Sequence, residues 1–120
     1  MQPSPANRSY ARAGIVSGLW RYPVKSMTGE ALARTDLSWA GLAGDRRWAF
    51  VRPGVERSGF PWLTLRERPG MGQFRPYFVD PVRPDSSQTI VCTPGGDEYD
   101  VTDRALAALL GDVGWKHRLD

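Results

Sequence analysis

Residues 22–30 read YPVKSMTGE, and they close the first predicted strand of the chain. The preceding stretch, GIVSGLWRY at residues 14–22, has apolar residues on both sides of an extended backbone, which predicts a short strand with both faces at least partly covered. Pro23 ends this strand because it has no N–H to donate to a neighbouring strand. Lys25 and Ser26 therefore lie in a loop at the strand end, where an ammonium and a hydroxyl stand beside backbone N–H groups.

Similar patterns recur along the chain and predict further short strands. Pro76 restricts one of them to a sheet edge or a bulge. Residues 94–97 read PGGD and form the turn of a predicted hairpin. The predicted strands are ALARTDLSW (31–39, half-buried), RRWAFVRPG (46–54), PWLTLRE (61–67), GQFRPYFVDP (72–81) and the hairpin TIVCTPGGDEYDV (89–101).

One helix is predicted near the end of the sequence. Thr102 is a good N-cap residue, residues 104–110 (RALAALL) have strong helix propensity, and Gly111 suits the C′ position. The residues after it, 112–120, predict the start of a last short strand. The predicted apolar face of the helix consists of Leu106, Leu109 and Leu110.

The predicted fold is mainly β: a small, mostly antiparallel barrel, closed or partly closed, with one short helix near the C-terminus. Parallel strands would need helical crossovers, and the sequence shows none between its strands. Closure would remove the exposed strand edges of such a small sheet. A chain of 120 residues favours one domain. We assign residues 14–120 to this domain and residues 1–13 to a flexible leader.

Composition narrows the class of protein further. The lone cysteine, Cys92, allows no internal disulfide framework and favours a reducing compartment such as the cytoplasm. No apolar run is long enough to span a membrane. His117 has no second ligand nearby, and Cys92 is expected in the core, so neither residue predicts a metal site.

Basic residues occur at three predicted strand ends. Lys25 lies at the first, and Arg66 or Arg68 lies at the third. At the second, Arg46 and Arg47 are neighbours on an extended chain, so only one of them can face a given cavity. Each of these residues alone is more often a solvated surface charge. Together they favour a concave site for an anion.

Three stretches resemble the signature regions of the N-terminal β-barrel domain of MOSC proteins. This family includes the amidoxime-reducing component of mitochondria, its bacterial relatives and the C-terminal part of molybdenum cofactor sulfurases. The first stretch is the most specific, and the order and spacing of the other two also fit. The resemblance extends over residues 14–120. The three stretches are LWRYPVKSMTGE (19–30), GLAGDRRWAFV (41–51) and LTLRERP (63–69).

The resemblance implies a cofactor-binding role. Members of the family bind the molybdenum cofactor, a pterin dithiolene that carries a phosphate, in a cleft between this barrel and a following MOSC domain. The family's contacts carry over to Lys25, Ser26 and Arg46. We expect these three side chains to line one concave surface.

The resemblance also implies that this chain holds only part of the site. In the family, the cysteine that ligates molybdenum belongs to the following MOSC domain, which we expect outside this chain, and Cys92 does not match it. No catalytic or metal-binding residue is therefore assigned, and no catalysis is expected from the chain alone. With a MOSC domain in cis or in trans, the implied chemistry is reduction of N-hydroxylated compounds or sulfur transfer. Without that domain, the apolar rim is expected to allow a homodimer.

A second interpretation needs no cofactor: a non-catalytic, basic β-barrel that binds single-stranded nucleic acid or a protein partner. A net charge of only +3 argues against nucleic acid. In a cofactor-binding module the tryptophans should be mostly buried, whereas base stacking would place them on one open face. Binding to nucleic acid would also depend steeply on salt. The four tryptophans on different predicted strands are Trp20, Trp39, Trp48 and Trp62.

Overall fold

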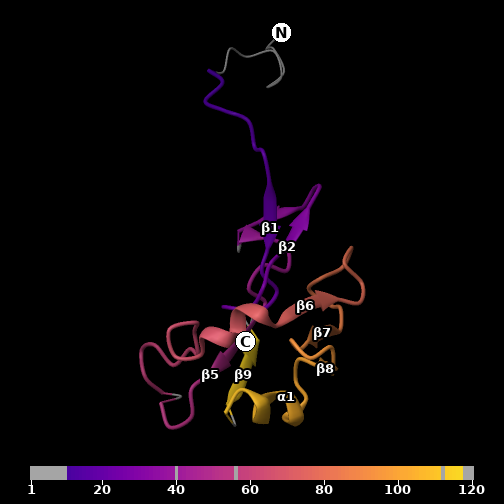
Figure 1. Cartoon of the computed structure of the whole chain (residues 1–120). Helices are drawn as coiled ribbons and strands as arrows, with labels where there is room; N and C mark the ends of the chain where they lie inside the picture. Colours follow the sequence, from indigo (N-terminus) through magenta and orange to yellow (C-terminus); the bar gives the residue numbers. More distant parts are fainter. Residues whose placement is uncertain (1–10, 40, 56, 112, 118–120) are drawn as a thin grey trace.

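The computed structural model describes residues 11–39, 41–55, 57–111 and 113–117, in which short strands are joined by many turns (Figure 1). β1 and β2 lie toward the N-terminal end of the molecule, and α1 lies at the opposite end beside β5 and β9. The elements are β1 (Leu19–Arg21), β2 (Glu30–Leu32), β3 (Leu37–Ser38), β4 (Gly41–Leu42), β5 (Trp48–Val51), a 3-10 helix (Pro69–Gln73), β6 (Arg75–Phe78), β7 (Thr89–Cys92), β8 (Glu98–Asp100), α1 (Arg104–Leu109) and β9 (Gly114–His117).

The strands form four small sheets in which every strand pair is antiparallel. The sheets are β1-β2, β3-β4, β5-β9 and β6-β7-β8. These pairings, together with one short helix, confirm the predicted mainly-β class. None of the sheets closes into a barrel over the described residues, so the predicted closure is not seen. Frequent proline and glycine residues keep the strands short, and short strands limit how far a sheet can extend.

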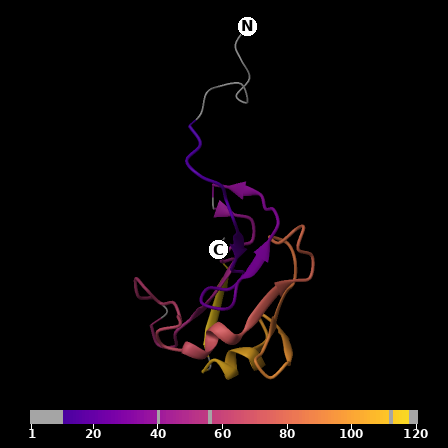
Figure 2. The same ribbon diagram turned by 45° about the horizontal axis from the view of Figure 1, so that its top comes forward.

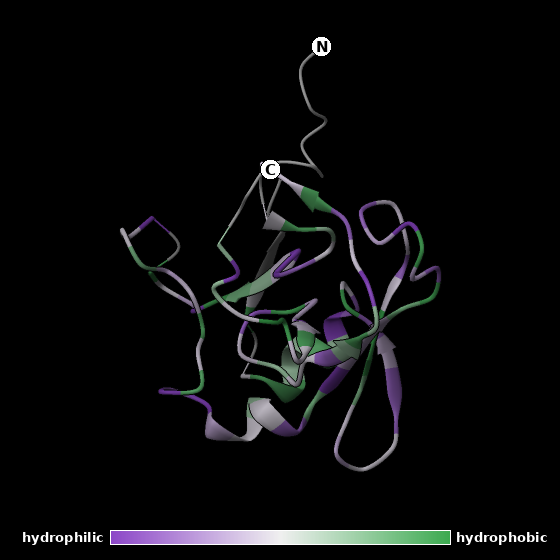
Figure 3. Ribbon diagram, turned by 90° about the horizontal axis from the view of Figure 1, so that it is seen from above, coloured by the Kyte–Doolittle hydropathy of each residue, from purple (hydrophilic) through white to green (hydrophobic). Residues whose placement is uncertain are grey.

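The hydrophobic core lies where β5, β7, the 3-10 helix and α1 meet. Phe50 of β5, Val91 of β7 and Leu106 of α1 are each fully buried. The Trp48 indole N–H donates to Thr89 Oγ1 at 2.9 Å, which joins β5 to β7 inside this core. Figure 2 shows α1 and the 3-10 helix at the same end of the molecule. In Figure 3 hydrophobic segments (green) gather near the centre of the view, and hydrophilic segments (purple) occur on the outer loops and also on some strands.

The first strand is shorter and more exposed than predicted. β1 covers only three residues, and Ile15 and Val16 before it are 80% and 73% exposed. The prediction that both faces would be at least partly covered was therefore wrong for the face of Val16 and Trp20, which is exposed. Residues 31–39 do not form one half-buried strand either, because they divide between β2 and β3 and remain largely exposed. Nothing within the described chain packs over these segments tightly enough to bury them.

A partly buried ion pair joins β1 to β2 and to the rest of the fold. Arg21 is 3% exposed, and its Nε lies 2.5 Å from Glu30 Oε1. Its Nη1 donates to the carbonyl of Ala43 at 3.2 Å, and its guanidinium lies 4.9 Å from the centre of the Phe78 ring. Because the small β1-β2 sheet lacks a core of its own, these polar contacts carry much of its attachment.

The β6-β7-β8 sheet matches its prediction closely. β6, which contains Pro76, is an edge strand of this sheet. The β7-β8 hairpin turns through residues 94–97, and the backbone N–H of Thr93 donates to the carbonyl of Asp97 at 2.8 Å. The predicted strands at 46–54 and after 112 correspond to β5 and β9, which pair with each other.

Residues 61–67 do not form the predicted strand. Trp62 makes a single bridge to Val51, and the chain then turns. The carboxylate of Glu67 accepts hydrogen bonds from both the backbone N–H and the hydroxyl of Thr64. These bonds hold the turn and lower the pKa of Glu67. A side chain that caps a turn in this way competes with strand formation.

The predicted helix is present with a different N-cap. Asp103 caps α1 by accepting a hydrogen bond from the N–H of Ala105 at 2.8 Å, whereas Thr102 donates to the carboxylate of Asp100. Gly111 has a φ of 100°, as its predicted C′ position requires. On the predicted apolar face, Leu106 and Leu110 are buried but Leu109 is 57% exposed.

Residues 1–10 of the predicted leader (residues 1–13) lie outside the described residues, and the boundary of the leader stays a prediction. Within the described chain, no helix is long and apolar enough to cross a membrane.

Candidate functional site

The three predicted cofactor contacts line one open hollow in the surface of the molecule. Its volume is ≈ 480 Å³. The geometric prediction that these side chains share a concave surface is thus confirmed, while their role in binding stays a prediction. The hollow is lined by Tyr22, Lys25, Ser26, Met27, Thr28, Gly29, Arg46, Leu65 and Gly72.

Lys25 is held in place by the start of β5. Its backbone N–H donates to the carbonyl of Trp48 at 3.0 Å, and the N–H of Trp48 donates to the carbonyl of Pro23 at 3.0 Å. Val24 forms a parallel bridge with Trp48 and is fully buried. The apolar residue before Lys25 therefore fills the core, and this fixes the backbone from which the ammonium extends.

Arg46 is held by Tyr22, which belongs to the other side of the hollow. The backbone N–H of Arg46 donates to the carbonyl of Tyr22 at 2.5 Å, and its guanidinium lies 5.2 Å from the centre of the Tyr22 ring. Nη1 of Arg46 forms an ion pair with Asp45 Oδ2 at 2.6 Å. The Arg46 side chain remains 54% exposed, so its guanidinium is open to solvent and to a ligand.

Two residues of the hollow have a backbone conformation that L-residues rarely adopt. Ser26 has a φ of 71° and Arg46 a φ of 48°, and no other described residue apart from glycines has a positive φ. This conformation costs about 1–2 kcal/mol for a residue with a Cβ atom. A glycine would avoid most of this cost. Strain of this kind is typical of functional sites, and here both strained positions line the same hollow.

The polar groups of the hollow suit an oxyanion. Lys25 Nζ lies 6.0 Å from the centre of the Phe60 ring and forms no ion pair with any described residue. The Ser26 hydroxyl has no hydrogen-bond partner among the described residues either. An ammonium, a hydroxyl and a partly exposed guanidinium together offer several donors to a phosphate or carboxylate.

The sequence analysis missed other parts of the wall. Thr28 is fixed by hydrogen bonds to the 3-10 region: its N–H donates to the carbonyl of Phe74 at 2.9 Å and its hydroxyl donates to that of Gly72. Tyr22 and Leu65 supply apolar surface. Both belong to stretches that were singled out, but an aromatic residue beside a proline and a leucine in a strand-like run gave no signal of a binding role.

The remaining basic candidates are engaged elsewhere. Arg47 Nη1 donates to the carbonyls of Pro84 and Ser87 at 3.0 and 2.7 Å, and burial lowers the pKa of Arg47 although nearby Asp85 opposes this. Arg68 Nε donates to the carbonyl of Leu110 at 3.3 Å, at the C-terminal end of α1. Of the third signature stretch, Leu65 reaches the hollow, whereas Arg66 and Arg68 are not among its lining residues.

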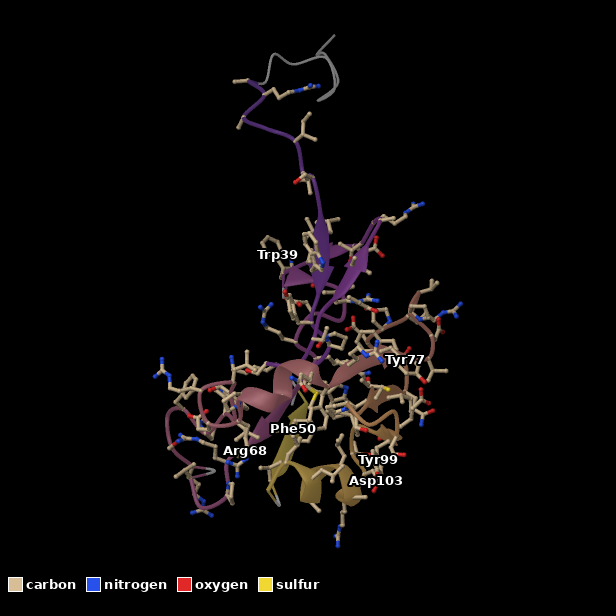
Figure 4. The ribbon with its side chains drawn as sticks, viewed as in Figure 1. Trp39, Phe50, Arg68, Tyr77, Tyr99 and Asp103 are labelled. Carbon is tan, nitrogen blue, oxygen red and sulfur yellow. The ribbon has the colours of Figure 1, made fainter. Side chains whose placement is uncertain are left out.

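The tryptophans are only partly buried. Trp48 belongs to the core and Trp62 is half-buried. Trp20 is 55% exposed and Trp39 is fully exposed, so the expectation of mostly buried tryptophans is wrong for these two. Figure 4 shows Trp39 near β1, far from Phe50 in the core. Neither exposed tryptophan lines the hollow.

Cys92 does not belong to the hollow. It is half-buried on β7 instead of lying fully in the core, and its Sγ lies 3.6 Å from the carbonyl oxygen of Thr93. No group of three or more His, Cys, Asp or Glu side chains in the described chain is placed to hold a metal ion.

Replacing Gly29 by alanine should disturb the hollow. A Cβ atom at Gly29 would lie 2.7 Å from Cε1 of Tyr22, so the Tyr22 ring must move. Because that ring also lies beside the Arg46 guanidinium, we expect Gly29→Ala to displace both side chains and to cost about 1–3 kcal/mol of stability. Urea unfolding would measure this loss. Gly70→Ala is the control, because no atom lies within 4 Å of a Cβ there, and equal losses for both variants would contradict the prediction.

Comparison with known proteins gives one result. A family model described as the MOSC N-terminal beta barrel domain matches residues 13–111. This range contains every lining residue of the hollow. No curated protein and no solved structure matches the chain.

Proposed function

This chain belongs to the MOSC N-terminal β-barrel domain family, and we propose that it is the N-terminal module of a MOSC protein that binds the molybdenum cofactor. In this role it contributes contacts to the phosphate and the pterin of the cofactor. The observation that carries the proposal is the convergence of Lys25, Ser26 and Arg46 on one hollow, with the last two in strained conformations.

The residues present fit a phosphate-bearing ligand. The Lys25 ammonium is a compact charge without an ionic partner among the described residues. The Ser26 hydroxyl can donate to a second phosphate oxygen, and Arg46 keeps donors beyond the Nη1 that Asp45 occupies. Tyr22 and Leu65 offer apolar surface to a flat ring. In this proposal the chain binds and orients its ligand and does not itself transfer protons or electrons.

The proposal assigns the chemistry to the complete protein. When bound, the cofactor would supply the metal centre for reduction of N-hydroxylated compounds or for sulfur transfer. A MOSC domain, in cis or in trans, would provide the remaining contacts. Phe60 and Leu65, which are 54% and 45% exposed near the hollow, would belong to the rim that this domain covers. The same rim would support a homodimer of the isolated chain.

Lys25→Ala should weaken phosphate binding without harming the fold. One charge-assisted hydrogen bond is lost, which corresponds to about tenfold weaker binding of inorganic phosphate to the full chain. The melting temperature should change little, because the partly exposed ammonium makes no ion pair with a described residue. Isothermal titration calorimetry would measure the affinity, and thermal unfolding the stability.

The matched control for Lys25→Ala is Arg104→Ala, which removes one positive charge from an exposed position on α1 outside the hollow. Both variants change the net charge equally. Equal affinities for the unaltered chain and Lys25→Ala, or equal losses in the two variants, would remove the specific role of Lys25.

A second candidate function is binding of single-stranded nucleic acid, and exposed Trp20 and Trp39 favour it. The two differ in salt dependence, because neutralising several nucleic-acid phosphates gives a steep slope of affinity against salt. Quenching of tryptophan fluorescence by a short oligonucleotide, with such a slope, would support this candidate. Saturable binding of inorganic phosphate that depends on Lys25 would support the first candidate function, cofactor binding.

A further inference from the structure

Asp45 contacts two residues that line the hollow, Tyr22 and Arg46. Its Oδ1 accepts a hydrogen bond from the backbone N–H of Tyr22 at 2.8 Å, and its Oδ2 accepts one from Arg46 Nη1 at 2.6 Å. We propose that Asp45 is a positioning residue for anion binding, which orients Arg46 toward the hollow. This inference rests on the proposed function, because it concerns how the same site holds a phosphate.

The contact differs from an ordinary surface ion pair. The Asp45 side chain is only 16% exposed, and one carboxylate oxygen is already fixed by the main chain of Tyr22. The position of the second oxygen is therefore fixed as well, and Arg46 Nη1 donates a hydrogen bond to it. An exposed pair of two mobile side chains contributes little, but a carboxylate held by the backbone restricts its partner much more.

The turn before Arg46 fixes the direction of this contact. Gly44 has a φ of 77°, and a Cβ atom there would lie 2.6 Å from Pro84, so the chain passes tightly at this point. The N–H of Asp45 donates to the carbonyl of Leu42 at 3.0 Å, and Arg46 continues in the left-handed region. Asp45 and the carbonyl of Tyr22 thus hold Arg46 by its side chain and by its backbone.

Simple electrostatics makes the opposite prediction. Asp45 is negative, so removing its charge should favour an anion in the hollow. Water and salt around the open hollow weaken this repulsion, however, because the Arg46 side chain is 54% exposed. When an anion binds, a mobile arginine side chain loses conformational entropy, which weakens binding. Because Asp45 already restricts the Arg46 side chain in the free protein, less entropy is lost on binding. At about 0.15 M salt, the loss of positioning should therefore outweigh the gain in charge.

Asp45→Asn separates the two effects. An asparagine keeps Oδ1 for the Tyr22 N–H, but its amide then faces Arg46 Nη1 with a donor and cannot accept from it. We expect this variant of the full chain to bind inorganic phosphate about threefold to tenfold more weakly at about 0.15 M salt, with a nearly unchanged melting temperature. Calorimetric titration measures the affinity. Tighter or equal binding would overturn the inference.

A double variant distinguishes positioning from a general structural effect. If Asp45 acts through Arg46, Asp45→Asn should cause no further loss of phosphate affinity in an Arg46→Ala background. The same loss in both backgrounds would overturn the inference. If Lys25→Ala weakens binding and Asp45→Asn does not, only the role of Asp45 fails. If the unaltered chain binds no phosphate, the proposed function and this inference fail together.

Discussion

Arg46→Gly should lose phosphate binding and yet leave the protein about 1 kcal/mol more stable than Arg46→Ala does. Both changes remove the guanidinium, its ion pair with Asp45 and its contact with the Tyr22 ring. They differ only in the backbone, because Arg46 has a φ of 48° and glycine adopts that conformation without the clash of a Cβ atom. The difference between the variants therefore measures the strain at this position.

Phosphate affinity should fall equally in both variants, by about tenfold to hundredfold, since each loses one or two charge-assisted hydrogen bonds. Urea unfolding gives the stabilities, and calorimetric titration of the full chain gives the affinities. Ser26→Gly and Ser26→Ala repeat the comparison at the other strained position, where φ is 71°. If the alanine variants are as stable as the glycine variants, neither position stores strain. If affinity is unchanged, the hollow is not the phosphate site.

Glu30→Ala should destabilise the protein by about 2–4 kcal/mol, because it leaves the charge of Arg21 buried without its ionic partner. Arg21 is 3% exposed and lies 2.5 Å from Glu30, whose side chain is 27% exposed. The carbonyl of Ala43 and the Phe78 ring remain as neighbours, but neither carries a compensating charge. In a domain of this size such a loss lowers the melting temperature by about 10 °C or more.

The control for Glu30→Ala is Asp80→Ala. Asp80 pairs with Arg83 at 3.2 Å, and both side chains are substantially exposed, at 43% and 75%. Removing this acid should cost less than about 1 kcal/mol. Thermal and urea unfolding of both variants would measure the contrast. A small loss in Glu30→Ala, similar to the control, would show that the Arg21 charge finds water when its partner is removed.

Features decided by neighbouring residues could be predicted from the sequence. The turn at residues 94–97 and the termination of α1 before Gly111 follow from the conformational preferences of glycine and proline. Pro76 restricted its strand to a sheet edge or a bulge, and β6 is an edge strand. The N-cap was placed one residue too early, because Thr102 and Asp103 are both good N-cap residues. Only the structure shows that the Thr102 hydroxyl donates to Asp100, which leaves Asp103 to cap the helix.

Features that depend on distant packing could not be predicted. Ile15 and Val16 are apolar in an extended segment, but alternation does not say whether another element will cover them, and none of the described residues buries them. Barrel closure has the same difficulty, because it requires pairing between strands that the local pattern cannot assign. Residues 61–67 show a further limit of prediction from pattern. Their alternation predicted a strand, but Glu67 accepts a hydrogen bond from Thr64 and the chain turns there instead.

The site was predicted in part for a physical reason. Lys25 and Ser26 follow a proline that ends a strand, and the resemblance to a known family selected Arg46 over Arg47. The left-handed backbone of Ser26 and Arg46 gave no signal, because residues other than glycine and asparagine seldom mark such positions. The contribution of Tyr22 was also hidden, since it depends on contacts with Arg46 across the hollow.

The pairing of β5 with β9 has a consequence for synthesis on the ribosome. Val51 pairs with Gly114 and Trp48 with His117, so β5 cannot acquire this partner until translation has passed residue 117 and that segment has left the exit tunnel. The backbone of Trp48 also holds Lys25. A nascent chain that stops earlier presents the open edge of β5, which other chains can pair with and aggregate. The β5-β9 sheet, whose β5 strand holds the backbone of Lys25, is therefore completed late in biogenesis, and chaperone capture would be needed most in the interval before β9 emerges.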